Sequence, residues 1–246
     1  MKRHDALLAA LALLLAWQAS AMVVNLPILP APLKVFSVFI RELQSDLLSH
    51  FAFSLWRVFA GMALSVLVAA PVGLAIGGSK KLNRLFSPLI YLLYPIPKVV
   101  FVPVVILFLG IGDVAKIAIM FLILFFQIIV LVRDQAAGLP PQLIQSLQSL
   151  GAGRRALFRF VYLPASLPAI LTALRQSIGT AVAVLYITEL SATKYGLGYY
   201  IYYNGSTLLD YPAMYAGVVA MSLLGLGMYF TVDWLERKWC QWKFVT

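Results

Sequence analysis

The chain has 246 residues, of which 62% are hydrophobic and only 11% are charged. A soluble domain of this size needs a more charged surface, so the composition excludes an ordinary soluble protein and indicates an integral membrane protein. The formal net charge of +10 is compatible with a nucleic-acid partner, but lysines and arginines also gather in the cytoplasmic loops of membrane proteins. The single cysteine, Cys240, excludes an intramolecular disulfide, and the two histidines, His4 and His50, are too far apart in sequence to favour a metal site.

Six apolar runs approach the roughly 20 residues that a helix needs to cross a bilayer. In chain order their approximate bounds are 6–24, 51–78, 85–109, 115–132, 170–192 and 213–234. The first run has a second interpretation, because basic residues precede it and Ala19-Ser20-Ala21 resembles a signal-peptidase site. We favour a retained span, since the rest of the chain is polytopic. The sequence therefore predicts an all-α integral membrane protein with six transmembrane helices.

Small residues and prolines mark two of these runs. Ala69, Gly73 and Gly77 recur at four-residue spacing in the second run, which places them on one face and allows close helix packing. The third run contains Pro97 and Pro103, and prolines leave backbone carbonyls unpaired in a helix.

The distribution of basic residues sets the orientation. With the N-terminus in the cytoplasm, twelve of the 19 lysines and arginines fall in cytoplasmic segments. The outer segments hold Lys34, Arg41, Lys116 and Lys194, and the remaining three, Arg57, Lys98 and Arg175, fall in or near spans. This bias predicts that both termini are cytoplasmic, and it accounts for most of the net charge without a nucleic acid.

The longest predicted cytoplasmic segment lies between the fourth and fifth spans. Pro140 and Pro141 are suited to open a helix, in which apolar residues then recur at helical spacing. Two glycines predict a break, after which a second short helix carries arginines on one face and ends at Pro164. Two interpretations are open at this point: a basic amphipathic segment that rests on lipid, or a docking element for a cytoplasmic partner.

The spacing of this segment, "QSLQSLGAGRRALFRFVYLP" from Gln145, resembles the EAA loop of permease subunits of ABC importers. That loop has a Glu-Ala-Ala triplet, three residues, a glycine, nine residues and then Ile-x-Leu-Pro. Here the glycine is Gly151, and Val161-Tyr162-Leu163-Pro164 closes the pattern. Gln145-Ser146-Leu147 stands where the family has the triplet, so the glutamate that the family often uses at its ATPase interface is absent.

The resemblance extends over most of residues 50 to 205. The stretches "IPKVVFVPVVILFLGIGDVAKI" and "LPASLPAILTALRQSIGTAVAVLYITEL" are similar to the nitrate/sulfonate/taurine branch of these permeases. The resemblance implies the type I ABC importer permease fold, with one permease domain over residues 1–246 and a coupling loop over residues 134–164. The residues that it assigns to ATPase docking are Gln145, Gly151, Arg154, Arg155, Arg159, Leu163 and Pro164.

The partners follow from the same resemblance. The chain has no G-x-x-x-x-G-K-[ST] loop to hold ATP phosphates. We therefore expect no enzyme activity, cofactor or metal in this chain, with ATP and Mg held by two cytoplasmic ATPase subunits. An extracytoplasmic binding protein is expected to deliver the substrate to a pair of permeases, as a homodimer, in the inner (plasma) membrane of a bacterium. The implied mechanism is alternating access.

A charged residue within a membrane span costs free energy on insertion, so each one is expected to have a structural or functional role. Lys98 lies between Pro97 and Pro103, and it is interpreted either as a pathway residue that attracts an anion or as a side chain that snorkels to an interface. For Arg57 we favour packing or snorkelling, and for Glu189 a structural ion pair. A place on the translocation pathway is the alternative for both, and these charges point to an anionic or zwitterionic substrate.

Other functions remain as alternatives. An ion-coupled secondary transporter or channel also uses broken helices and buried charges, but such folds often contain inverted repeats, and we find none that is convincing here. A membrane-embedded enzyme would need a nucleophile or a metal-ligand pattern, and none is recognised. The substrate stays open among nitrate, sulfonates, taurine and pyrimidine or thiamin precursors, as does the choice between a homodimer and a heterodimer.

Overall fold

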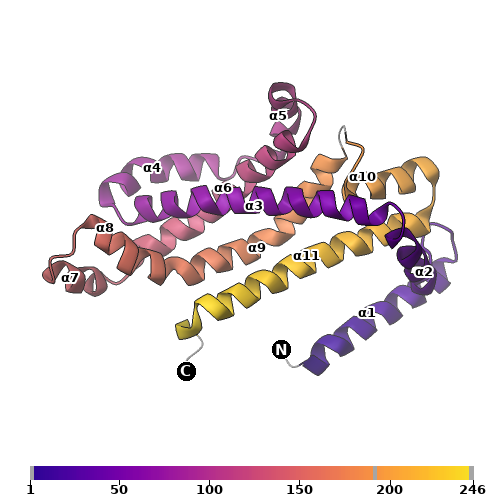
Figure 1. Ribbon diagram of the computed structural model, residues 1–246, viewed down its shortest axis with the longest axis horizontal. Helices are drawn as coiled ribbons and strands as arrows, with labels where there is room; N and C mark the ends of the chain where they lie inside the picture. The colour runs from indigo at the N-terminus through magenta and orange to yellow at the C-terminus, as the bar shows by residue number, and fades with distance from the viewer. Residues whose placement is uncertain (1–2, 191–192, 244–246) are drawn as a thin grey trace. The chain divides into compact units, whose positions relative to one another are not determined.

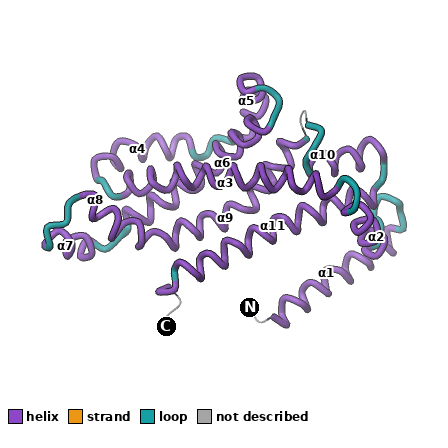
Figure 2. Tube along the Cα trace, in the orientation of Figure 1, coloured by secondary structure: helices purple, strands orange, loops and turns teal. Residues whose placement is uncertain are grey.

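The computed structural model describes residues 3–190 and 193–243, and every regular element in these ranges is helical (Figure 1). The long helices are α1 (Arg3–Val24), α3 (Leu47–Gly77), α6 (Asp113–Ala137), α9 (Leu163–Glu189) and α11 (Tyr211–Trp239). The short ones are α2 (Pro32–Leu43), α4 (Lys80–Leu93), α5 (Val102–Leu109), α7 (Pro141–Ser149), α8 (Arg154–Leu157) and α10 (Leu197–Tyr202). Figure 2 shows how few loop residues separate these helices. The prediction of an all-α fold is confirmed.

Five helical segments are long and apolar enough to cross a membrane, and a bent helix pair makes a sixth if it counts as one span. The five segments are Leu7–Val24, Leu47–Gly77, Asp113–Ala137, Arg154–Glu189 and Tyr211–Trp239. Each coincides with a predicted run, although Arg154–Glu189 begins well before residue 170, where the fifth predicted run starts. The predicted end of that run, Ala192, lies outside the described residues.

The third predicted run, 85–109, is broken. Helix α4 and the segment Lys98–Leu109 meet at a bend of 77°. Pro95 and Pro97 lie at the break, where each lacks an N–H donor and pushes the residue before it out of the helical conformation. The run therefore consists of two shorter helices joined by a turn.

The chain divides into two compact units. The smaller unit comprises Met1–Ser54 and Glu189–Leu224, and the larger comprises Leu55–Thr188 and Gly225–Thr246. In the smaller unit the Trp17 ring stacks on Tyr215 of α11, with ring centroids 5.8 Å apart.

The larger unit is built on a close contact between α3 and α6. A Cβ atom added at Gly73 would lie 3.1 Å from the Val132 side chain, and one at Gly77 would overlap the carbonyl oxygen of Arg133. Ala69, one turn before Gly73, is fully buried. The predicted small-residue face is therefore the face that brings the two helix backbones together.

A buried arginine fixes α4 against α6 in the same unit. The Arg133 Nη1 atom donates a hydrogen bond to Ser87 Oγ at 2.8 Å and lies 3.4 Å from Asn83 Oδ1. Its guanidinium carbon lies 4.7 Å from the centre of the Tyr91 ring. Because the three α4 residues are four apart, they form one polar stripe that faces α6.

Candidate functional site

The segment between α6 and α9 begins as the sequence predicts. Helix α7 starts at Pro141 after an N-cap at Pro140, and Gly151 has a φ of 79°, in the left-handed region. The Ala152 N–H donates to the Leu147 carbonyl at 3.0 Å and the Gly151 N–H donates to the Gln148 carbonyl at 2.9 Å. This paired bonding is the Schellman arrangement, which a glycine in that position allows. The predicted helix start and glycine break are therefore confirmed.

The segment packs on itself through a small apolar core of its own. Buried Leu139, Leu157 and Val161 form its centre. Partly buried Ile144, Leu147, Ala152, Tyr162 and Ala165 surround them. The Tyr162 hydroxyl donates a hydrogen bond to the Gly78 carbonyl at 3.3 Å, which ties the segment to the end of α3. The segment is therefore a folded element attached to the helices, and we call residues 139–165 the docking segment, after the role that the family resemblance predicts for it.

The outer surface of the docking segment combines positive charge with apolar side chains. Arg154, Arg155 and Arg159 are all exposed. Leu150, at the tip of the glycine turn, is 84% exposed, and Phe160 is also exposed. Exposed apolar groups rimmed by charge are typical of a surface that contacts a protein or a membrane.

Pro164 does not stop the helix, and that prediction was wrong. Helix α8, a π turn at Phe158–Tyr162 and α9 form one segment that is continuous from Arg154 to Glu189. The Leu163 N–H bonds to the Phe158 carbonyl, five residues earlier. Widening to a π turn accommodates a proline, because Pro164 has no N–H to offer the carbonyl four residues before it and its ring would collide with that group. The docking segment is consequently joined to α9 without a break, and the start of the predicted loop, residues 134–137, belongs to α6.

Lys98 lies at the broken third run. Its Nζ atom donates to the carbonyl oxygens of Leu93 and Tyr94, both at 2.6 Å, and lies 4.5 Å from the centre of the Phe126 ring. A cation on the last carbonyls of α4 is favoured by the helix dipole and satisfies groups that the break would leave unpaired. Pro97 and Pro103 flank this lysine and are exposed. Lys98 is therefore held in the turn between α4 and α5.

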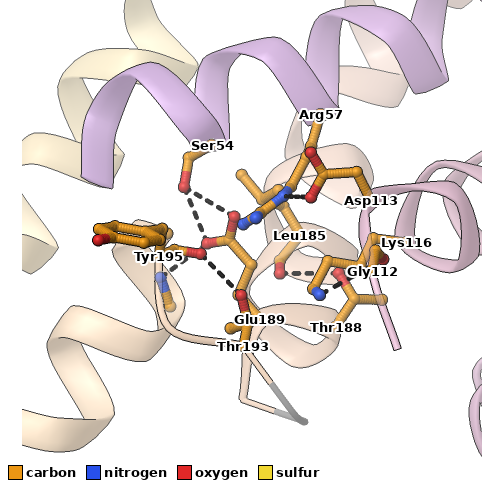
Figure 3. A network of polar contacts seen from close by, with 12 residues as sticks. Ser54, Arg57, Gly112, Asp113, Lys116, Leu185, Thr188, Glu189, Thr193 and Tyr195 are labelled. Atoms are coloured by element: carbon orange, nitrogen blue, oxygen red, sulfur yellow. Dashed lines mark hydrogen bonds and ion pairs between the residues drawn. The ribbon is translucent and has the colours of Figure 1, made fainter. Parts of the chain in front are cut away.

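Arg57 is buried and paired. Its Nε atom lies 2.8 Å from Asp113 Oδ1, and its side chain is 4% exposed (Figure 3). Asp113 is the first residue of α6, where the helix dipole favours a negative charge. The pair links α3 to the start of α6, which supports the packing interpretation of Arg57.

Glu189, in the smaller unit, is fully buried and holds a turn. Its carboxylate oxygens lie 2.9 and 2.8 Å from Ser54 Oγ (Figure 3), and one of them accepts the Gly198 N–H at 2.9 Å. Ser54 Oγ also accepts the Leu197 N–H at 2.8 Å. Glu189 and Ser54 together therefore satisfy the first N–H groups of α10, where a negative charge is favoured.

A glycine and a histidine complete this turn. Gly196 has a φ of 136°, which is strained for any other residue. His50 Nδ1 lies within 3.0 Å of both the N and the O atom of Gly196, and its ring lies 5.3 Å from that of Tyr200.

Among the described residues no group of three or more His, Cys, Asp and Glu side chains is placed to hold a metal ion.

Sequence comparison assigns the chain to a family. The family model described as the binding-protein-dependent transport system inner membrane component matches residues 61–240. The chain belongs to this family.

Individual relatives support that assignment. A putative ABC transporter permease protein of Methanocaldococcus jannaschii is 34% identical over 234 residues, which cover 92% of this chain and 87% of the relative. The taurine transport system permease protein TauC of Escherichia coli is 30% identical, over 81% of this chain and 72% of its own length. The formylaminopyrimidine transport permease protein ThiX of Halalkalibacterium halodurans is 28% identical, over 95% and 93%.

Solved structures show the same fold. The MetNI methionine ABC transporter in an inward-facing conformation has a TM-score of 0.67 at 21% identity, over 78% of this chain and 95% of that chain. A bacterial ABC transporter for import of the acidic polysaccharide alginate has a TM-score of 0.62 at 17% identity, over 96% and 94%. The chain therefore has the fold of an ABC importer permease.

Several polar residues of this permease were not singled out from the sequence. They are Ser54, Asp113, Arg133, Asp233 and Glu236. The two acids near the end of the last span had a signal, because a carboxylate at such a position requires a partner. The serine gave none, since serine is common in transmembrane helices and its partners lie far away in the sequence.

Proposed function

We propose that this permease is the membrane subunit of an ATP-driven importer for a small anionic or zwitterionic solute of the sulfonate and taurine type. Its family and its relatives named for taurine and aliphatic sulfonate transport support the substrate class. A relative named for formylaminopyrimidine transport keeps that class of solute in the screen described below.

The observation that carries the proposal is the docking segment. It has its own apolar core, and it is continuous with a membrane-spanning helix. We assign ATPase docking to its exposed surface, with Arg154, Arg155 and Arg159 as candidate contacts beside Leu150 and Gln145. Gly151 shapes the turn that presents Leu150, whereas Leu163 and Pro164 are the first residues of α9, where the segment overlaps that helix.

The rest of the assembly follows the family pattern in this proposal. Residues 1–246 form a single permease domain with residues 134–164 as its coupling loop. Two ATPase subunits bind ATP and Mg, two copies of this chain surround the pathway, and a binding protein delivers the solute from outside. Both termini lie in the cytoplasm, and the membrane is the bacterial inner membrane.

Alternating access supplies the mechanism. When ATP closes the ATPase dimer, the docking segments move with it. Because the helix is continuous from Arg154 to Glu189, that movement passes directly into a membrane span. We propose that Lys98, with Pro97 and Pro103, lies on the pathway at the break between α4 and α5, and that Arg57 and Glu189 hold the helices near the outer mouth.

Reconstitution tests the proposal. The permease, its co-expressed ATPase and the binding protein are placed in vesicles, and ATP hydrolysis is measured with taurine, an alkanesulfonate, nitrate or formylaminopyrimidine. We expect the binding protein loaded with one of these solutes to stimulate hydrolysis several-fold over the unloaded protein. Uptake by the permease alone, driven by an ion gradient, would overturn the proposal.

Point variants on the exposed surface test the docking assignment. Leu150→Ser removes an exposed apolar side chain, and Arg155→Glu reverses a charge, so neither disturbs the apolar core of the segment. Both are expected to weaken co-purification of the ATPase, and Gln148→Ser, an exposed polar neighbour, serves as the control. Unchanged ATPase association in both variants would favour a segment that rests on lipid.

A further inference from the structure

Helix α2 (Pro32–Leu43) divides its surface into three sectors. A helix advances about 100° per residue, so residues three, four and seven apart share a face. One sector is buried or half-buried and holds Val35, Val38, Phe39 and Glu42. The second is apolar and exposed, with Leu33 at 80%, Phe36 at 63% and Ile40 at 44% exposure. The third is polar and exposed and holds Lys34, Ser37 and Arg41.

The first sector faces the protein. Val35 is 2% exposed. Burial, and then the nearby Glu42 carboxylate, raise the pKa of the Tyr200 phenol in α10. Helix α2 thus packs against its own unit through one sector only, and the apolar sector beside it has no cover among the described residues.

Chain continuity places α2 at a bilayer surface. Helix α1 ends at Val24 and α3 begins at Leu47, and both are long and apolar enough to cross a membrane. At 12 residues, α2 is too short to cross one itself. Exposed apolar side chains continue from Val23 through Leu26 and Ile28 into the apolar sector of α2. Exposed apolar side chains therefore lie at the end of α1 and in the connection as far as Ile28, and again on α2 after buried Pro30.

Charge identifies the occupant of the apolar sector. Lys34 and Arg41 lie seven residues, or about two turns, apart along α2 in the polar sector that adjoins the apolar one. Arg41 also pairs with Glu42 at 3.1 Å, in a largely exposed contact that leaves the guanidinium open to water. A helix with apolar side chains toward acyl chains and cations at their edge is suited to lie in the headgroup layer of a phospholipid bilayer.

We propose that α2 is an interfacial anchor, lying flat in the phospholipid headgroup layer with Leu33, Phe36 and Ile40 inserted toward the acyl chains. In the orientation proposed above, this layer belongs to the outer leaflet. The anchor fixes the connection between the first two spans. This inference concerns lipid contact, and it holds whether or not the chain imports a sulfonate.

Spin labelling tests the anchor in the full-length protein. The single cysteine, Cys240, is replaced by serine, and nitroxide labels are attached at Phe36→Cys or Ile40→Cys and, as matched controls, at Ser37→Cys or Lys34→Cys. The protein is reconstituted in vesicles of phosphatidylethanolamine and phosphatidylglycerol. Labels at 36 and 40 are expected to collide more with oxygen than with a water-soluble nickel chelate, and labels at 34 and 37 to show the reverse.

Two results would overturn the proposal. If labels at 36 and 37 were equally accessible to the nickel chelate, α2 would lie in water. If labels at 36 and 40 were shielded from both oxygen and nickel, a protein surface such as a second copy would cover the sector. The two apolar positions are independent, so a variant that fails to fold at one leaves the other as a test.

Discussion

Arg175 of α9 and Glu236 of α11 lie 2.9 Å apart, measured from Nη1 to Oε2, and they join the helix that carries the docking segment to the last span. The same Nη1 atom lies 3.1 Å from Asp233 Oδ1. Glu236 Oε1 lies 2.7 Å from Lys243 Nζ, beyond the end of α11. The ion pairs of this C-terminal cluster hold α9 against α11. Movement of the docking segment is therefore expected to move both helices.

Glu236→Gln is expected to destabilise the protein. The Glu236 side chain is 1% exposed and contacts both Arg175 and Lys243, so its neutralisation weakens two charged hydrogen bonds, at a cost on the order of 2 kcal/mol. The measurement is the thermal unfolding midpoint in detergent. Lys243→Gln is the matched control, because Lys243 is 43% exposed and such a contact is worth about 1 kcal/mol or less. Equal midpoints for the two variants would contradict a central role for Glu236.

Cys240 reports on the same cluster. The thiol is fully buried, and burial, followed by the Glu236 carboxylate, raises its pKa. A raised pKa keeps the thiol protonated at neutral pH, and only the thiolate reacts readily. We expect slow maleimide labelling of the native protein at pH 7 and fast labelling after unfolding in dodecyl sulfate.

The only cysteine of the chain makes this reaction a clean readout. Glu236→Gln should accelerate native labelling, because it removes a negative charge near the sulfur and loosens the cluster. Native labelling as fast as in dodecyl sulfate, without any substitution, would show that Cys240 is not enclosed.

Gly77→Ala tests the contact between α3 and α6. An added methyl group would overlap the Arg133 carbonyl and approach the Ala136 side chain, and overpacking of this kind costs about 1–3 kcal/mol. Gly179→Ala in α9 is the control, because a Cβ atom there meets nothing within 4 Å and alanine favours a helix by about 1 kcal/mol. Thermal unfolding should therefore shift down for Gly77→Ala and not for Gly179→Ala; a shift in the opposite order would contradict the packing.

Much of the fold could be predicted from the sequence, because it depends on local properties. Run length identifies membrane spans, and four-residue spacing places Gly73 and Gly77 on one face. Gly151 could be identified as a turn residue for the same reason, since a glycine that ends an amphipathic helix permits a left-handed conformation.

The polar pairs could not be predicted, because they depend on how distant helices are rotated. Arg57 and Asp113 are 56 positions apart, and Arg175 and Asp233 are 58 apart. Whether such residues meet depends on how each helix is rotated about its own axis. That rotation in turn depends on kinks and π turns. Pro164 shows the difficulty: a proline normally ends a helix, but here the helix widens and continues.

Pro164→Ala is expected to rotate the docking segment about the helix axis relative to the rest of α9. Restoring the N–H lets the π turn at Phe158–Tyr162 close as an ordinary α turn, and the loss of one extra residue from a turn rotates the two parts by about 100° relative to each other. Arg155 and Arg159 would then point away from the surface that presents them. We expect ATPase association to weaken on the order of tenfold, or about 1.4 kcal/mol, in the co-purified complex.

Pro168→Ala is the matched control, because Pro168 lies inside α9, beyond the π turn. Its replacement restores a helical N–H without altering the turn, so ATPase association should stay at the level of the unsubstituted protein. Far-ultraviolet circular dichroism and the unfolding midpoint verify that both variants are folded. If Pro164→Ala bound the ATPase as tightly as Pro168→Ala, the π turn would have no part in presenting the docking surface, and the continuity of α8 with α9 would be the feature that matters.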